Sequence, residues 1–157
     1  NVVFVSPDVG NVKRTRVFAE KAGCDLAIID KRRTSGTTTM MYHIIGEVEG
    51  KDVIMIDDMI ATAGTVCEAA KIVRERGARS VRAAATHAVF AGAALDRLEQ
   101  APLTESVVTD SIPVSAEARK RLPNLVVVSV AEMLGESIAR IHKHQSVSSL
   151  FNLSLLG

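Results

Sequence analysis

The chain has 157 residues, of which 47% are hydrophobic and 24% are charged, a composition that predicts a folded protein with one sizeable core. The net charge of +1 provides no overall field to attract nucleic acid or a membrane, and an aromatic content of 3% disfavours a base-stacking surface. No apolar run approaches the roughly 18 residues of a membrane span. We therefore expect neither nucleic acid nor a membrane as a partner. The two cysteines, Cys24 and Cys67, lack a CxxC spacing and are expected to be reduced thiols of a cytoplasmic protein.

Apolar runs of strand length alternate with segments of helical periodicity along the chain. In chain order, strands are expected at 2–5, 25–30, 40–48, 52–57, 80–87, 105–110 and 124–130. Helices are expected at 11–22, 64–77, 92–100, 115–121 and 130–144. Strands that are apolar throughout and alternate with helices predict an α/β fold, a mostly parallel sheet with helices on both faces. One exception is expected, an antiparallel hairpin between 40–48 and the next strand across the short turn at 49–51.

The stretch VIMIDDMIATAGTV, residues 53–66, places Asp57 and Asp58 at the end of an apolar strand, where ligands of open α/β sheets bind. The loop that follows, 62–65, offers backbone N–H groups and hydroxyls at a helix start, which favours a bound phosphate. The adjacent acids suit sugar hydroxyls, or a magnesium ion shared with pyrophosphate. This combination predicts a ribose 5-phosphate site. The competing interpretation is an ordinary helix N-cap beside solvated acids.

VIMIDDMIATAGT closely resembles the ribose-phosphate-binding loop of the phosphoribosyltransferase fold. Three further stretches narrow the resemblance: FVSPDVGNVKRTR (4–16), AIIDKRR (27–33) and SVSSLF (146–151). Together they resemble the C-terminal half of a class I ribose-phosphate pyrophosphokinase. The resemblance implies a type I phosphoribosyltransferase-like fold, with residues 1–157 as a single domain and 146–157 as its tail. Since the chain opens at Asn1 directly on an apolar strand, we expect it to be a piece of a longer protein.

The resemblance implies an activity: transfer of the diphosphoryl group of ATP to the C1 hydroxyl of ribose 5-phosphate, giving phosphoribosyl pyrophosphate and AMP, with Mg²⁺ as cofactor. It implies catalytic roles for Lys31 and Arg33, whose charges would stabilise the transferred group, and a lid at 34–39. Without that context, residues 31–33 would suit a solvated basic turn. The family also implies that the intact protein is a homo-oligomer, a hexamer. We expect the 157 residues alone to turn over substrate poorly.

Site residues follow from the same resemblance. Asp57 and Asp58 match the acids that hold the ribose hydroxyls, and the remaining substrate positions are Ala61, Thr62, Ala63, Gly64 and Thr65. Asp8 matches a magnesium-ligand position, with a helix N-cap as its competing role. Ser146 and Ser148 resemble residues around the family's allosteric phosphate or ADP site.

Ala61 departs from the family, which commonly has an acid at this position. A lost charged hydrogen bond costs about 1.5–3 kcal/mol, which would slow an enzyme without abolishing binding. Two alternatives stay open beside the pyrophosphokinase, and Ala61 gives weight to the second. One is a phosphoribosyltransferase that consumes phosphoribosyl pyrophosphate and a base, and the other is a regulatory paralogue that does not catalyse.

Overall fold

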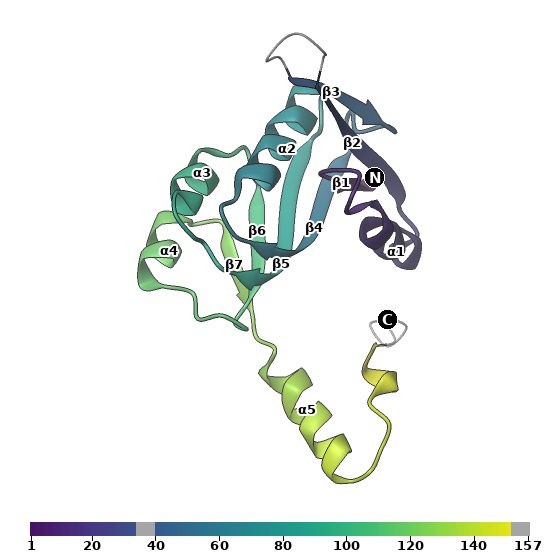
Figure 1. The fold of residues 1–157 in the computed structure, drawn as a ribbon, viewed down its shortest axis with the longest axis vertical. Coiled ribbons are helices and arrows are strands. Elements are labelled where there is room, and N and C mark those ends of the chain that lie inside the picture. Colours follow the sequence, from purple (N-terminus) through teal and green to yellow (C-terminus); the bar gives the residue numbers. More distant parts are fainter. Residues whose placement is uncertain (34–39, 152–157) are drawn as a thin grey trace.

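The structure is a computed structural model that describes residues 1–33 and 40–151. Within these residues, one seven-stranded sheet has the order β3-β2-β1-β4-β5-β6-β7 (Figure 1). The strands are β1 (Val2–Ser6), β2 (Asp25–Arg33), β3 (Met40–Ile45), β4 (Asp52–Ile60), β5 (Ser80–Ala88), β6 (Glu105–Thr109) and β7 (Leu125–Val128). The helices are α1 (Val12–Ala22), α2 (Gly64–Glu75), α3 (Ala94–Gln100), α4 (Ala116–Arg121) and α5 (Ala131–His142), followed by the 3-10 helix η1 (Ser148–Phe151). The predicted α/β architecture is confirmed.

The antiparallel pair is not the predicted one. β3 pairs with β2, from Ile28 opposite Ile45 to Arg33 opposite Met40, whereas β4 lies parallel between β1 and β5. Gly46 explains the difference, because its φ of +104° turns the chain out of β3 where a Cβ would lie 2.9 Å from the Leu26 carbonyl oxygen. The prediction of a hairpin across 49–51 was therefore wrong, since the chain leaves the edge of the sheet there and enters β4 in its middle.

Several element ends also differ from the prediction. β2 runs three residues beyond 30, β3 and β7 are shorter than expected, and β4 continues through both acids to Ile60. This extension follows from pairing, because Met59 lies opposite His87 and Ile60 opposite Ala88 on β5. Asp58 is thus a strand residue like Asp57, and β4 continues for two residues beyond the acids before the loop begins.

The main core fills the space between the sheet and α2, and a second, smaller layer lies on the other face. Val3 and Val5 of β1 belong to the main cluster with Met55 of β4 and Val73 of α2. Because successive strand residues point to opposite faces, the buried Phe4 points toward the face that α1 covers. Helices on both faces leave the carboxyl ends of the strands as the open edge where a ligand can bind.

α5 differs from the other helices because it has no buried residue. Its apolar side chains Met133, Leu134, Ile138 and Ile141 are all about half exposed or more. Figure 1 shows α5 beyond the end of β7, extending away from the sheet before the chain turns back through η1. Among the described residues, no helix is long and apolar enough to cross a membrane.

Candidate functional site

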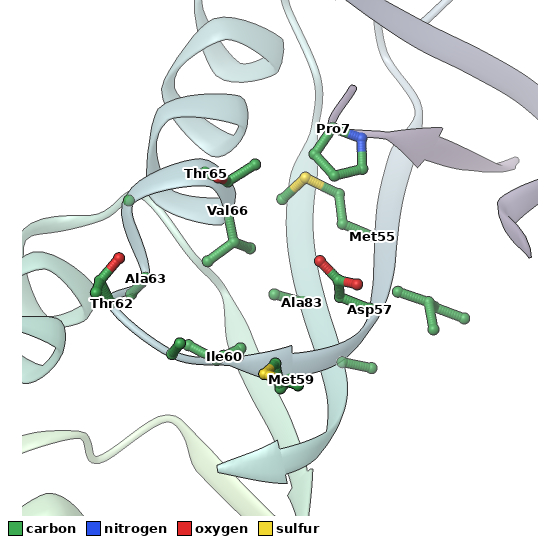
Figure 2. A pocket seen from close by; sticks show the side chains of 14 residues that line it. Pro7, Met55, Asp57, Met59, Ile60, Thr62, Ala63, Thr65, Val66 and Ala83 are labelled. Carbon is green, nitrogen blue, oxygen red and sulfur yellow. The ribbon is translucent and has the colours of Figure 1, made fainter. Parts of the chain in front are cut away.

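A cavity opens beside the start of α2, where β1 and β4 end (Figure 2). Asp57 points into it from β4, and Thr65 and Val66 face it from the first turn of α2. Five of the predicted substrate positions line the cavity in succession: Ala61, Thr62, Ala63, Gly64 and Thr65. The structure therefore brings the predicted loop and one of the predicted acids around a single space.

The start of α2 is suited to an anion. In the part of the chain that the structure describes, no side chain caps this helix and its first turn holds no acid. The residue before the helix, Ala63, is buried and has a left-handed backbone with φ of 59°. Since the first N–H groups of a helix have no partner within it, those of Gly64 and Thr65 are available to a phosphate.

The segment between β5 and α3 holds this loop in place. The backbone N–H of Phe90 donates to the carbonyl oxygen of Ile60 at 3.0 Å, and that of Ala91 donates to Ala61 at 2.9 Å. Arg97 of α3 donates through Nη1 to the carbonyl oxygen of Thr62 at 2.6 Å. Sequence reasoning missed these contacts, because two are made by the main chain and the third by an unremarkable helix arginine.

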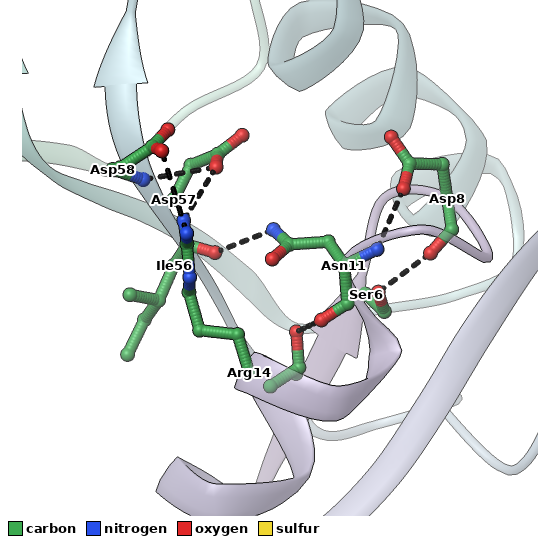
Figure 3. A network of polar contacts seen from close by, with 8 residues as sticks. Ser6, Asp8, Asn11, Arg14, Ile56, Asp57 and Asp58 are labelled. Atoms are coloured by element: carbon green, nitrogen blue, oxygen red, sulfur yellow. Dashed lines mark hydrogen bonds and ion pairs between the residues drawn. The ribbon is translucent and has the colours of Figure 1, made fainter.

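Asp57 and Asp58 share one arginine (Figure 3). Arg14 of α1 lies 3.2 Å from Asp57 Oδ1 through Nη1 and 3.3 Å from Asp58 Oδ2 through Nη2. Burial raises the pKa of the Asp57 carboxyl, whereas the hydrogen bond from Arg14 lowers the pKa of Asp58. Arg14 was missed from the sequence, where its only signal was its place in FVSPDVGNVKRTR.

Asp8 lies in the turn between β1 and α1. Its Oδ1 accepts the backbone N–H of Asn11 at 2.9 Å, a hydrogen bond within the turn. Asn11 is the residue that precedes α1, and among the described residues no side chain caps this helix, so Asp8 does not have the competing N-cap role. Asn11 in turn donates through Nδ2 to the Ile56 carbonyl oxygen at 3.0 Å, which ties the turn to β4 next to Asp57 (Figure 3). The magnesium role of Asp8 stays a prediction. In the described residues no three acidic, histidine or cysteine side chains cluster as a metal site, so Mg²⁺ would need substrate oxygens and water beside Asp8, which is how this ion commonly binds.

Lys31 does not line the cavity in this structure. Its Nζ lies 2.6 Å from Oε2 of Glu68, a residue of α2 one turn beyond the loop at 61–65. Arg33 belongs to β2, but its side chain and the predicted lid at 34–39 lie outside the described residues.

Ser146 and Ser148 lie on the arm formed by α5 and η1. The backbone N–H of Ser148 donates to Ser146 Oγ at 3.2 Å, and Arg140 donates to the Ser146 carbonyl oxygen at 3.2 Å. These contacts order the arm internally. The allosteric role of the two serines stays a prediction.

Comparison with known proteins identifies the relatives of the chain. A curated relative from Gloeobacter violaceus, named ribose-phosphate pyrophosphokinase, is 51% identical over 152 residues, which are 96% of this chain and 45% of that protein. A relative of the same name from Synechococcus elongatus is 50% identical over 153 residues, 96% of this chain and 46% of that one. The chain spans about half the length of the curated relatives it matches.

The fold has a counterpart among solved structures. The phosphoribosylpyrophosphate synthetase from Mycobacterium smegmatis superposes with a TM-score of 0.81 at 36% identity, over 91% of this chain and 45% of that one. A family model described as the phosphoribosyl synthetase-associated domain matches residues 33–152. The chain therefore belongs to the phosphoribosyl synthetase-associated domain family.

Proposed function

We propose that this chain supplies the ribose 5-phosphate site of a ribose-phosphate pyrophosphokinase, which transfers the diphosphoryl group of ATP to the C1 hydroxyl of ribose 5-phosphate. The supporting observation is the cavity in which Asp57 lies opposite the uncapped start of α2. An acid and a helix start that line one cavity suit a ligand with hydroxyls at one end and a phosphate at the other.

In the proposed complex, the 5-phosphate accepts hydrogen bonds from the backbone N–H groups of Gly64 and Thr65. It also accepts hydrogen bonds from the hydroxyls of Thr62 and Thr65. Asp57 and Asp58 accept hydrogen bonds from the ribose hydroxyls, which replace the guanidinium of Arg14. These contacts fix the sugar so that its C1 hydroxyl faces the nucleotide.

The reaction forms a bond between the C1 oxygen and the β-phosphorus of ATP and breaks the bond from that phosphorus to the oxygen it shares with the α-phosphate. AMP leaves with the bridging oxygen, and the hydroxyl proton passes to solvent. Lys31 and Arg33 are proposed to stabilise the charge of the transferred group. When bound beside Asp8, Mg²⁺ would neutralise charge on the phosphate oxygens.

Other parts of the proposal come from the relatives. We propose that the protein works in the cytoplasm as a homo-oligomer, a hexamer, and that Ser146 and Ser148 contribute to an allosteric phosphate or ADP site. We also propose that the 157 residues alone turn over poorly, because the chain covers about half of each relative. Full-length levels of activity from the isolated 157 residues would contradict the last point.

The test is AMP formation from ATP, ribose 5-phosphate and Mg²⁺ by the longest natural form of this chain. Lys31→Ala should lower kcat by about 100-fold or more, since a charge that stabilises the transition state is lost. Lys21→Ala, an exposed lysine at the end of α1, is the matched control and should leave kcat unchanged. Any increase in the kcat of Ala61→Asp over that of the wild type measures how much activity is lost through the missing acid.

Two results would favour another function. Pyrophosphate release from phosphoribosyl pyrophosphate that depends on an added base, without AMP formation from ATP, indicates a phosphoribosyltransferase. Binding of ribose 5-phosphate with no turnover of either kind indicates the regulatory paralogue.

A further inference from the structure

Three side chains from different elements meet beside the candidate site. Lys31 of β2 places its Nζ 2.6 Å from Glu68 Oε2, and Tyr42 of β3 donates its hydroxyl to Glu68 Oε1. The ammonium also lies 6.0 Å from the centre of the Tyr42 ring. Both carboxylate oxygens of Glu68 are thus engaged, one by a cation and one by a phenol.

The cluster is charged and partly screened from water. The Lys31 side chain is 23% exposed and that of Glu68 is 43% exposed. The hydrogen bond from Lys31, followed by that from Tyr42, lowers the pKa of the Glu68 carboxyl. The same bond to Glu68 raises the pKa of the Tyr42 hydroxyl. Glu68 is therefore held as a carboxylate, a negative oxygen pair that faces the Lys31 ammonium.

The place of Glu68 on α2 connects this cluster to the cavity. Glu68 follows Thr65 by three residues, and residues three apart are neighbours on a helix surface. Thr65 lines the cavity from the first turn. The Lys31 ammonium is consequently held about one helical turn from the proposed phosphate site, at a carboxylate that offers the same ligand atoms as a phosphate group.

We propose that Glu68 and Tyr42 are positioning residues for Lys31, which hold its ammonium in the free protein and exchange it for the oxygens of a polyphosphate when nucleotide binds. This inference rests on the proposed function and extends it. In the exchange, the contact between Nζ and Glu68 Oε2 breaks and one between Nζ and a phosphoryl oxygen forms, while Tyr42 keeps its bond to Glu68. Glu68 therefore competes with the nucleotide, so removing its charge should tighten nucleotide binding.

The first test is kinetic and uses the longest natural form of the chain. Glu68→Gln should lower the KM for ATP, by up to roughly fivefold, with kcat little changed, because the competing carboxylate is gone. Glu75→Gln removes the same charge two turns further along α2 and should leave both constants unchanged. In a Lys31→Ala background, Glu68→Gln should no longer change the KM. A fall in kcat of Glu68→Gln comparable to that of Lys31→Ala would overturn the exchange.

The second test needs no turnover, because Tyr42 is the one tyrosine among the 157 residues and tryptophan is absent from them. Its phenolate absorbance, taken as a difference spectrum against Tyr42→Phe, follows the cluster directly. Glu68→Gln should bring the Tyr42 pKa down toward its ordinary value. Added inorganic pyrophosphate or α,β-methylene ATP should raise the Tyr42 pKa further in the wild type, since Glu68 loses its cation and binds the phenol more strongly.

The two tests separate this inference from the proposed function. A protein that makes AMP but whose Tyr42 spectrum does not respond to either probe would refute the exchange alone. A protein that makes no AMP, yet shows the pyrophosphate response, would retain the exchange and lose the proposed reaction.

Discussion

The loop that lines the cavity and the charged groups at and beside the cavity are held in place by different kinds of bond. The loop at 61–65 is fixed mainly by the main chain, through Phe90 and Ala91 donating to Ile60 and Ala61, with one side-chain hydrogen bond from Arg97. The charged groups are held by side-chain ion pairs that solvent reaches, Arg14 with the two acids and Lys31 with Glu68.

This difference distinguishes the loop, which is formed before a ligand binds, from the ion pairs, whose partners a ligand can replace. The main-chain hydrogen bonds hold the loop without a ligand, so its N–H groups are in position before the proposed phosphate binds. A partly exposed ion pair is weakly held, and a ligand that offers the same charge can replace one partner. The comparison predicts that changes on the loop side affect folding and the binding of ribose 5-phosphate, whereas changes on the charged side affect nucleotide binding and the pH dependence of stability.

The largest effect is expected at Ala63, the left-handed residue of the loop. Ala63→Val should lower the free energy of unfolding by about 1–3 kcal/mol, because a branched side chain strains a backbone with positive φ. Ala63→Gly is the matched control and should stay within about 1 kcal/mol of the wild type, since glycine tolerates this conformation but loses a buried methyl group. Urea unfolding measures both. Equal stability of the two variants would contradict a preformed loop.

A smaller effect is expected at Arg97, the side chain that contacts the loop. Arg97→Ala removes the donor to the Thr62 carbonyl oxygen, and one hydrogen bond contributes about 0.5–1.5 kcal/mol. We expect ribose 5-phosphate affinity to fall by roughly two- to tenfold in calorimetric titration. Arg97→Lys keeps the positive charge but not the guanidinium geometry, so it separates the contribution of the charge from that of the hydrogen bond to Thr62. Unchanged affinity in Arg97→Ala would show that the main chain alone sets the loop.

The smallest effect on stability is expected at Arg14, and it should depend on pH. The folded pKa of Asp58 is lowered by Arg14, so this pair stabilises the fold above the unfolded pKa of Asp58 and loses that contribution as pH falls through the folded pKa. The stability difference between wild type and Arg14→Ala should therefore be present near neutral pH and vanish in acid. Asp57 has the opposite sign, because its raised pKa disfavours the folded state above that pKa.

Urea unfolding at a series of pH values measures this difference. Arg16→Ala, an exposed arginine of the same helix, should show no such pH dependence. A difference between Arg14→Ala and wild type that persists unchanged into acid would exclude the ion pair as its source.

The sequence predicted the elements better than their partners. Every expected strand and helix is present, because apolar runs and helical periodicity are local properties. The partner of β3 was wrong, since the deciding feature is the close approach of Gly46 to β2, a contact between residues about twenty positions apart. The position of the loop 61–65 at a cavity could be predicted because its residue types and order are contiguous in the chain, whereas its role in binding stays a prediction.

The contacts that sequence reasoning missed have a common physical reason. Arg14 is 43 residues from Asp57, and Arg97 is 35 residues from Thr62, so only folding brings each pair together. Phe90 and Ala91 act through backbone N–H groups, which every residue except proline has, and their side chains therefore give no signal. Glu68 looked like an ordinary residue of a helix face until the structure placed it against Lys31.

Small side chains on β5 bear on the size of ligand that the cavity can admit. Its wall on β5 is formed by Ala83 and Ala84, within a run of three alanines in the middle of the sheet. Alanine is the smallest residue with a side chain, so a larger side chain in place of Ala83 would take volume from the cavity. The size of ligand that the cavity admits thus depends in part on a strand that contributes only alanine to its lining. Evolution can alter that size there while leaving every hydrogen-bonding group of the site untouched.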